Sequence, residues 1–259
     1  AQGRGWPQGT GWGMQQAAAA GYGGWEPLVH APTDVVAVAA AARRAGLALP
    51  SVFVTGNLHD PREGAATLAR LTGVGRAAAD QGADRMMIYP SPAAKSPDNL
   101  ARQADHLNRL GAGLAAFGLV LGYHPEEPEM ADGAREVSHV LGATDPALVR
   151  LCLDPDTIWR GSGRDGAALL AFGRRHADRI TALHLRQSRS GVWAEVLGDG
   201  DIDHGPLAAG LCGRGRPPLL VVELAYAPDT PRTLAVPDAH RASLAWVRAT
   251  FAACLPPGA

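Results

Sequence analysis

The sequence predicts an α/β protein that folds as a (β/α)8 TIM barrel in a single domain over residues 1–259. Short apolar runs alternate along the chain with longer segments of helical periodicity, which is typical of strands connected by helices. Most of the runs lack the polar alternation of a half-exposed strand, so they indicate a parallel sheet covered by helices. The length of 259 residues suits one barrel, since such a barrel typically needs about 250.

The elements follow one another in a regular order. The expected strands are 23–29, 51–56, 85–89, 118–124, 149–154, 180–186 and 219–224. The expected helices are 32–45, 65–80, 98–116, 132–141, 165–176, 204–211 and 237–253. The expected caps are Thr33, Ser96 before Pro97, and Asp203, and the expected helix stops are Gly46, Gly82 and Gly118. One more strand, the first of the barrel, is expected to be short or truncated within 1–6 or upstream, before a helix over 13–20.

Composition narrows the range of functions. Lys and Arg number 24 against 25 Asp and Glu, so the chain lacks the basic surface that nucleic acid requires. No apolar run approaches the ~20 residues that cross a bilayer, and a membrane is not an expected partner. Cys152, Cys212 and Cys254 have no paired spacing, so free thiols and a reducing cytoplasm are expected. The sequence leaves the oligomeric state open, with a homo-oligomer among the alternatives.

Ionisable residues stand where several of the expected strands end. Asp154, His184 and Glu223 each terminate an apolar run, and the segment 123–129 that follows another run is rich in acids. In a barrel the carboxyl ends of the strands form the working face. Carboxylates crowded there repel one another unless a cation holds them. The pattern therefore predicts one divalent metal ion, Mn²⁺, Mg²⁺, Co²⁺ or Zn²⁺, bound by oxygen and nitrogen ligands.

Four segments carry a resemblance to a known family. They are 119–130 (LVLGYHPEEPEM), 151–163 (LCLDPDTIWRGSG), 182–203 (ALHLRQSRSGVWAEVLGDGDID) and 220–224 (LVVEL). These segments resemble the xylose-isomerase-like superfamily of sugar isomerases and epimerases, which includes inosose dehydratases and endonuclease IV. The resemblance implies the metal ligands Glu129, Asp154, His184 and Glu223. Many relatives resemble Y-H-x-H-x-x-E in the first segment, so Glu126 is the alternative to the preferred Glu129.

The resemblance also implies a reaction. A metal-dependent isomerase or epimerase would act on a keto sugar or polyol through an enediolate, and a lyase such as an inosose dehydratase would share that chemistry. A non-catalytic sugar-binding module is the remaining alternative, and a nuclease is disfavoured by the missing basic face. Glu129, Glu223 and His124 are the expected acid and base groups.

Other residues are expected around the substrate. Arg186, Glu126 and Trp159 are the expected substrate-binding residues, although Arg186 could instead form a salt bridge and Trp159 could pack in the core. Glu26 and His59 end or follow early strands and could also line the pocket.

Overall fold

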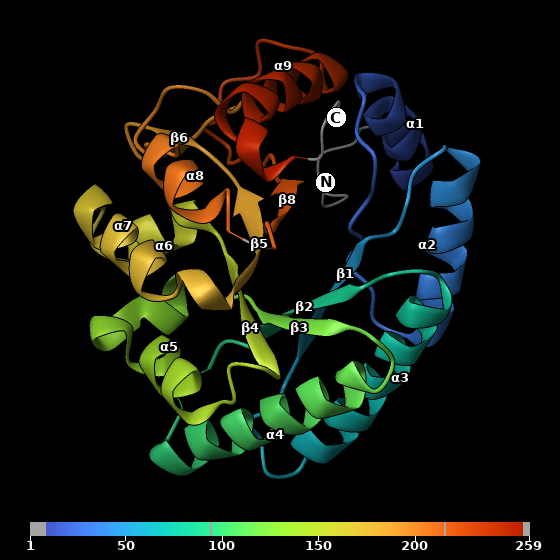
Figure 1. The fold of residues 1–259 in the computed structure, drawn as a ribbon, viewed down its shortest axis with the longest axis vertical. Helices are drawn as coiled ribbons and strands as arrows, with labels where there is room; N and C mark the ends of the chain where they lie inside the picture. Colours follow the sequence, from blue (N-terminus) through green and yellow to red (C-terminus); the bar gives the residue numbers. More distant parts are fainter. Residues whose placement is uncertain (1–8, 94, 215, 256–259) are drawn as a thin grey trace.

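A computed structural model describes residues 9–93, 95–214 and 216–255 as a barrel of parallel strands surrounded by helices (Figure 1). The strands are β1 (Ser51–Gly56), β2 (Arg85–Pro90), β3 (Val120–Tyr123), β4 (Val149–Leu153), β5 (Ile180–Leu185), β6 (Ser188–Arg189), β7 (Val192–Trp193) and β8 (Leu219–Val222). The α-helices are α1 (Thr10–Ala20), α2 (Pro32–Arg44), α3 (Gly64–Asp80), α4 (Pro97–Ala115), α5 (Ala131–Ala143), α6 (Pro155–Gly161), α7 (Gly166–Arg175), α8 (Gly205–Leu211) and α9 (Val236–Thr250). Short 3₁₀ helices are η1 (Glu127–Met130), η2 (Ala177–Arg179) and η3 (Ala252–Cys254).

The sheet confirms the predicted parallel barrel. Its order is β1-β2-β3-β4-β5-β8, with every pairing parallel, while β6 and β7 form a separate antiparallel hairpin. Helices surround the sheet, and α1 and α9, from opposite ends of the chain, lie side by side in Figure 1. Gly46, Gly82 and Gly118 adopt the left-handed conformation after α2, α3 and α4, as predicted for helix stops.

The expected strand over 23–29 is reduced to two isolated parallel bridges, Gly24 with Ala48 and Leu28 with Phe53. This part of the prediction is wrong because Pro27 has no amide hydrogen to donate, and adjacent glycines weaken a strand. A cavity of about 460 Å³ lies between residues 21–26 and β8. The expected first strand within 1–6 lies outside the described residues.

Helix starts agree with the sequence only in part. Ser96 caps α4 by accepting a hydrogen bond from the Asn99 amide. At the start of α2 the carboxylate of Asp34, not Thr33, accepts from the amides of His30 and Ala31. Such a carboxylate at the third helical position reaches back to the backbone amides just before the helix.

Alternating side chains along the strands build two layers of core. Outward-facing residues such as Val52 and Leu151 pack against the helices, and Phe53, Met87, Cys152 and Ala182 form an apolar cluster of their own. Since side chains alternate along a strand, the next positions on the inner face carry the polar groups described below.

Cys212 and Cys254 form a disulfide, so the expectation of free thiols is wrong for these two residues. They are 42 residues apart, and only the packing of α8 against η3 brings them together. Cys152 is a buried free cysteine, as predicted. Disulfides are typical of oxidising compartments, so the cysteines no longer support the expected cytoplasmic location. In the described ranges no helix has the length and apolar character needed to span a membrane.

Candidate active site

Ionisable side chains from neighbouring strands meet inside the barrel at the carboxyl ends of the strands. His124 follows β3, Asp154 follows β4, His184 and Arg186 lie at the end of β5, and Glu223 follows β8. All five are buried, and His124, Asp154 and His184 are 0% exposed. They share the inner face because each stands one position after an outward-facing strand residue.

The guanidinium of Arg186 is the cation at the centre of this group. Its Nε lies 2.8 Å from Asp154 Oδ2, and its terminal nitrogen lies 3.2 Å from Glu223 Oε1 and 3.6 Å from Glu126 Oε1. Although burial acts to lower it, the pKa of Arg186 is raised by Asp154 and Glu223. The sequence left open whether Arg186 forms a salt bridge, and the structure shows that it does.

Each ring nitrogen of His184 forms an ion pair with a carboxylate. Its Nε2 lies 2.8 Å from Glu26 Oε1, and its Nδ1 lies 2.9 Å from Glu223 Oε2. Burial acts to lower the pKa of His184, but Cys152, Glu26 and Glu223 raise it well above its usual value. Ser51 donates a hydrogen bond to Glu26, so this glutamate after an early run does line the group.

His124 is buried without a hydrogen bond on either ring nitrogen among the residues the structure describes. Its Nδ1 lies 3.6 Å from Glu126 Oε1, and its ring centroid lies 4.7 Å from that of His184. Burial and the nearby charge of His184 hold the pKa of His124 well below its usual value. His124 is therefore neutral, with the lone pair of one ring nitrogen available to an electrophile.

Glu126 is the glutamate of segment 123–129 that reaches this group. In addition to its contacts with Arg186 and His124, it accepts a hydrogen bond of 3.1 Å from the Thr157 hydroxyl. Burial raises the pKa of Glu126, and the charge of Arg186 opposes that rise. Its side chain is 28% exposed, so it is the acid of the group with the most access to solvent.

Glu129 points elsewhere. Its carboxylate accepts a hydrogen bond of 2.9 Å from the Glu126 amide across η1. Burial raises the pKa of Glu129 to about 7, and Glu136 and Lys95 are the charged side chains that act on it. His59 lies near the same pair of charges and not among the groups at the strand ends. The geometry thus favours Glu126 over Glu129, the reverse of the preference drawn from the sequence.

Trp193 is an aromatic side chain beside Arg186 that the sequence analysis missed. Trp159 is buried in the core, with Arg160 and Arg164 over its ring. Trp193 on β7 is half-buried, and the Arg186 guanidinium lies 5.5 Å from its ring centroid. Trp193 lies inside the segment 182–203, whose resemblance to the family could have marked it as a candidate site residue.

Buried Asp156 anchors the hairpin that carries Trp193. Its carboxylate accepts hydrogen bonds from Trp193 Nε1 at 2.8 Å, from the Ser188 hydroxyl at 2.5 Å and from Arg160 Nε at 2.7 Å. Asp154, two residues earlier, caps α6 through the amides of Asp156 and Thr157. The segment 154–156 therefore orients both the Asp154 carboxylate and the Trp193 ring.

The residues present fit a divalent cation. Ligand atoms of His124, Asp154 and Glu223 lie within 4.8 Å of one another, and so do those of His124, Cys152 and His184. In the described part of the chain the carboxylates of this buried group outnumber its cations, because Arg186 and protonated His184 face Glu26, Glu126, Asp154 and Glu223. Burial raises the pKa of Asp154 to about 7, and a metal ion would balance the negative charge that burial disfavours.

Comparisons with known proteins agree with this fold. Residues 14–250 match the family described as xylose isomerase-like TIM barrel. An inosose dehydratase from Bacillus licheniformis is 27% identical over 172 residues, which span 60% of this chain and 56% of that protein. The chain thus covers little more than half the length of this relative.

Solved structures share the barrel at low identity. A sugar phosphate isomerase/epimerase from Parabacteroides distasonis superposes with a TM-score of 0.75 at 18% identity, covering 93% of this chain and 88% of that one. The 3-keto-D-glucoside 4-epimerase of E. coli gives a TM-score of 0.72 at 17% identity, covering 96% and 98%. These likenesses show the fold.

Proposed function

The chain belongs to the xylose isomerase-like TIM barrel family, and from that premise we propose that it is a divalent-metal-dependent isomerase or epimerase of a keto sugar or polyol. The observation that carries the proposal is the buried group of Asp154, Glu223 and His124 around the Arg186 guanidinium. Burial of carboxylates costs folding free energy, and strongly perturbed ionisable groups of this kind cluster at functional sites.

The ion would be held by Asp154, Glu223 and a histidine, with Glu126 in the role that the sequence analysis assigned to Glu129. A divalent cation in such a site supplies electrophilic stabilisation of negative charge on adjacent substrate oxygens. The set of oxygen and nitrogen donors is compatible with Mn²⁺, Mg²⁺, Co²⁺ or Zn²⁺.

The chain's own residues would bind the sugar and move the proton. Arg186 offers N–H donors to the substrate oxygens, and Trp193 offers an aromatic face to its C–H surface. Removal of the proton next to the carbonyl gives an enediolate, and its return to the other face or the adjacent carbon gives an epimer or isomer. Glu126 suits the role of base, since it is partly exposed and its pKa is raised by burial; Glu223 and neutral His124 are the other acid and base groups.

A lyase is the second candidate, because the curated relative with 27% identity is an inosose dehydratase. Both reactions begin with the same proton abstraction. The lyase then expels an oxygen substituent from the β-carbon, which gives a conjugated enone that absorbs in the ultraviolet.

The experiment combines metal analysis with substrate screening. Elemental mass spectrometry should find about one divalent ion per chain, and keto sugars and inososes in D₂O should exchange the proton beside the carbonyl, as followed by NMR. Growth of ultraviolet absorbance would assign elimination, and exchange without it would assign isomerisation or epimerisation. A carbohydrate that stabilises the protein without metal and without exchange would instead indicate a binding module.

Asp154→Asn and Asp165→Asn form a matched pair for this experiment. Both aspartates cap a helix through two backbone amides, α6 and α7 respectively, but only Asp154 lies in the buried group. Asn also caps helices well, so neither variant should lose more than about 1 kcal/mol through the cap. Metal and activity should be lost from Asp154→Asn alone, and equal metal content in both variants would refute the ligand set.

Location and assembly stay predictions. A homo-oligomer would be found by light scattering, and a cytoplasmic location by fractionation of the native cells.

A further inference from the structure

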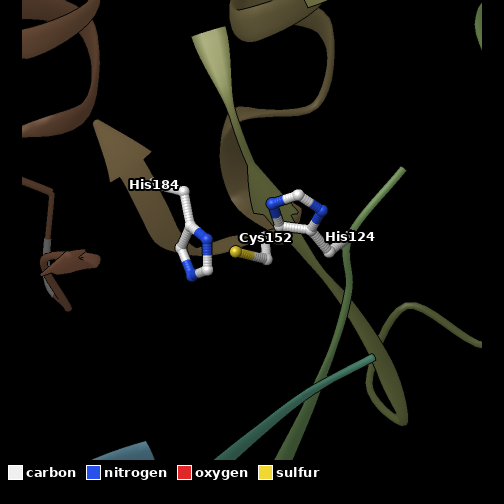
Figure 2. Close-up of side chains that lie close together, drawn as sticks. All are labelled: His124, Cys152 and His184. Atoms are coloured by element: carbon white, nitrogen blue, oxygen red, sulfur yellow. The ribbon is translucent and has the colours of Figure 1, made fainter. Parts of the chain in front are cut away.

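A second group of metal-ligating side chains converges inside the barrel, and it contains sulfur. Ligand atoms of His124, Cys152 and His184 all lie within 4.8 Å of one another. Figure 2 shows the Cys152 side chain, from β4, pointing between the imidazole rings of His124 and His184. The three residues come from three successive strands of the sheet, so the barrel itself fixes their spacing.

Burial of this group leaves polar atoms without partners. Each of the three residues is 0% exposed. Neither nitrogen of His124 forms a hydrogen bond within the described part of the chain, and a buried polar group left in this state costs about 1–3 kcal/mol. The observation that points to a bound ion is that His124, which has no hydrogen bond on its ring among the described residues, offers a nitrogen within 4.8 Å of ligand atoms of Cys152 and His184.

The surroundings close the group off from water. Phe53 packs against both histidine rings, with centroid distances of 5.3 Å to His124 and 5.7 Å to His184. Met87 and Ala182 belong to the same apolar cluster as Phe53 and Cys152. In such surroundings the attraction between a cation and its ligands is screened much less than in water.

His184 is already oriented as a metal ligand would be. A metal-bound histidine usually has a carboxylate on its other ring nitrogen, which fixes the orientation of the ring. His184 has Glu26 on Nε2 and Glu223 on Nδ1, so either nitrogen could turn to an ion while the other keeps its carboxylate.

We propose that His124, Cys152 and His184 bind Zn²⁺ or Co²⁺ through two imidazole nitrogens and a thiolate. Tetrahedral zinc places such donors about 3.3–3.6 Å apart, given bonds of about 2.0–2.3 Å. The present donors, within 4.8 Å of one another, would have to close by no more than about 1.5 Å. Thiolate selects borderline ions over Mg²⁺ and Mn²⁺, so Cys152 determines the class of metal.

The step is an exchange of a proton for a metal ion. The Cys152 S–H bond breaks, a sulfur–metal bond forms, and the proton leaves to solvent without any change of oxidation state. The proposal rests on the proposed function only in that the ion would lie in the same pocket. Glu223 would be near the ion because its carboxylate contacts His184.

The test uses Co²⁺ added to the full chain after chelation, without reductant so that the disulfide stays intact. Cys212 and Cys254 are joined, so a thiolate-to-cobalt charge-transfer band in the near ultraviolet can arise only from Cys152. We expect Co²⁺ to bind with this band. In Cys152→Ser the band should disappear and Co²⁺ affinity should fall about tenfold or more.

The outcomes separate the two proposals. Bound Co²⁺ without the band in the wild-type chain, abolished by Asp154→Asn, would overturn the thiolate site and leave the proposed carboxylate-bound metal standing. No bound Co²⁺ or other divalent ion would overturn both. The wild-type spectrum decides the point by itself if Cys152→Ser does not fold. Proton release on Zn²⁺ binding in weak buffer is the second readout, and its absence would likewise overturn the thiolate site.

Discussion

Replacement of Arg186 by Met should destabilise the metal-free protein by about 3–5 kcal/mol, the usual cost of breaking a buried ion pair by removing one partner. The side chain of Arg186 is 9% exposed and contacts Asp154, Glu223 and Glu126 at 2.8, 3.2 and 3.6 Å. Met keeps most of the volume but leaves these carboxylates without their shared cation. In a chain of 259 residues, such a loss should lower the melting temperature by on the order of 10 °C.

The assay is urea unfolding and thermal melting in the presence of a chelator, because a bound ion would replace part of the lost charge. Arg109→Met is the matched control. Arg109 pairs with Asp105 at 3.6 Å, but the two side chains are 59% and 63% exposed. Exposed pairs of this kind contribute about 0–1 kcal/mol, so the control should unfold almost as the wild type does.

A divalent ion should then stabilise Arg186→Met more than it stabilises the wild type, since the variant has more uncompensated negative charge. A loss for Arg186→Met no larger than that for Arg109→Met would refute the reasoning. It would mean that the carboxylates are neutralised or hydrated in the apo protein and that the guanidinium does not hold them.

Three further predictions concern the frame around the site. The double variant Cys212→Ser, Cys254→Ser should lose about 4 kcal/mol, from the entropy of a chain loop closed across 42 residues, and reductant should lower the unfolding midpoint of the wild type but not of this variant. Burial lowers the pKa of His240 from 6.5 to about 3, so as the pH falls the unfolded chain is protonated before the folded one. The free energy of unfolding should therefore fall by about 1.4 kcal/mol per pH unit below pH 6.5. In urea unfolding between pH 7.5 and 5, His240→Asn should flatten that slope. Asp156→Ala should free the hairpin and shift Trp193 fluorescence to the red, a shift that must be absent when Trp193→Phe is added.

The strand positions could be predicted because a strand that is buried on both faces is a continuous run of apolar residues in the sequence. The runs 51–56, 149–154 and 180–186 match β1, β4 and β5 to within one residue. The run 23–29 has the same apolar character, but Pro27 and the adjacent glycines reduce it to isolated bridges. Apolar content alone does not report whether the backbone can complete a ladder of hydrogen bonds.

The sequence predicted which types of residue form the candidate site, but it predicted less well which of them contact one another. Asp154, His184 and Glu223 stand at strand ends, and parallel strands bring such ends together. The difference between Glu126 and Glu129 depends on the turn at η1, where the Glu129 carboxylate bonds to the Glu126 amide and turns away from Arg186. Two glutamates three residues apart have the same chemistry, so only backbone geometry separates them.

By itself, the sequence determined the parallel barrel and the end of it that carries the ionisable groups, because the period of apolar residues and the alternation of strand and helix are local properties. Tertiary structure alone decided the disulfide, the Trp193 wall and the meeting of Cys152 with two histidines. Each of these depends on contacts between residues far apart in the chain, such as Trp193 with Asp156. The packing of strands and helices sets such contacts, and the local sequence pattern does not.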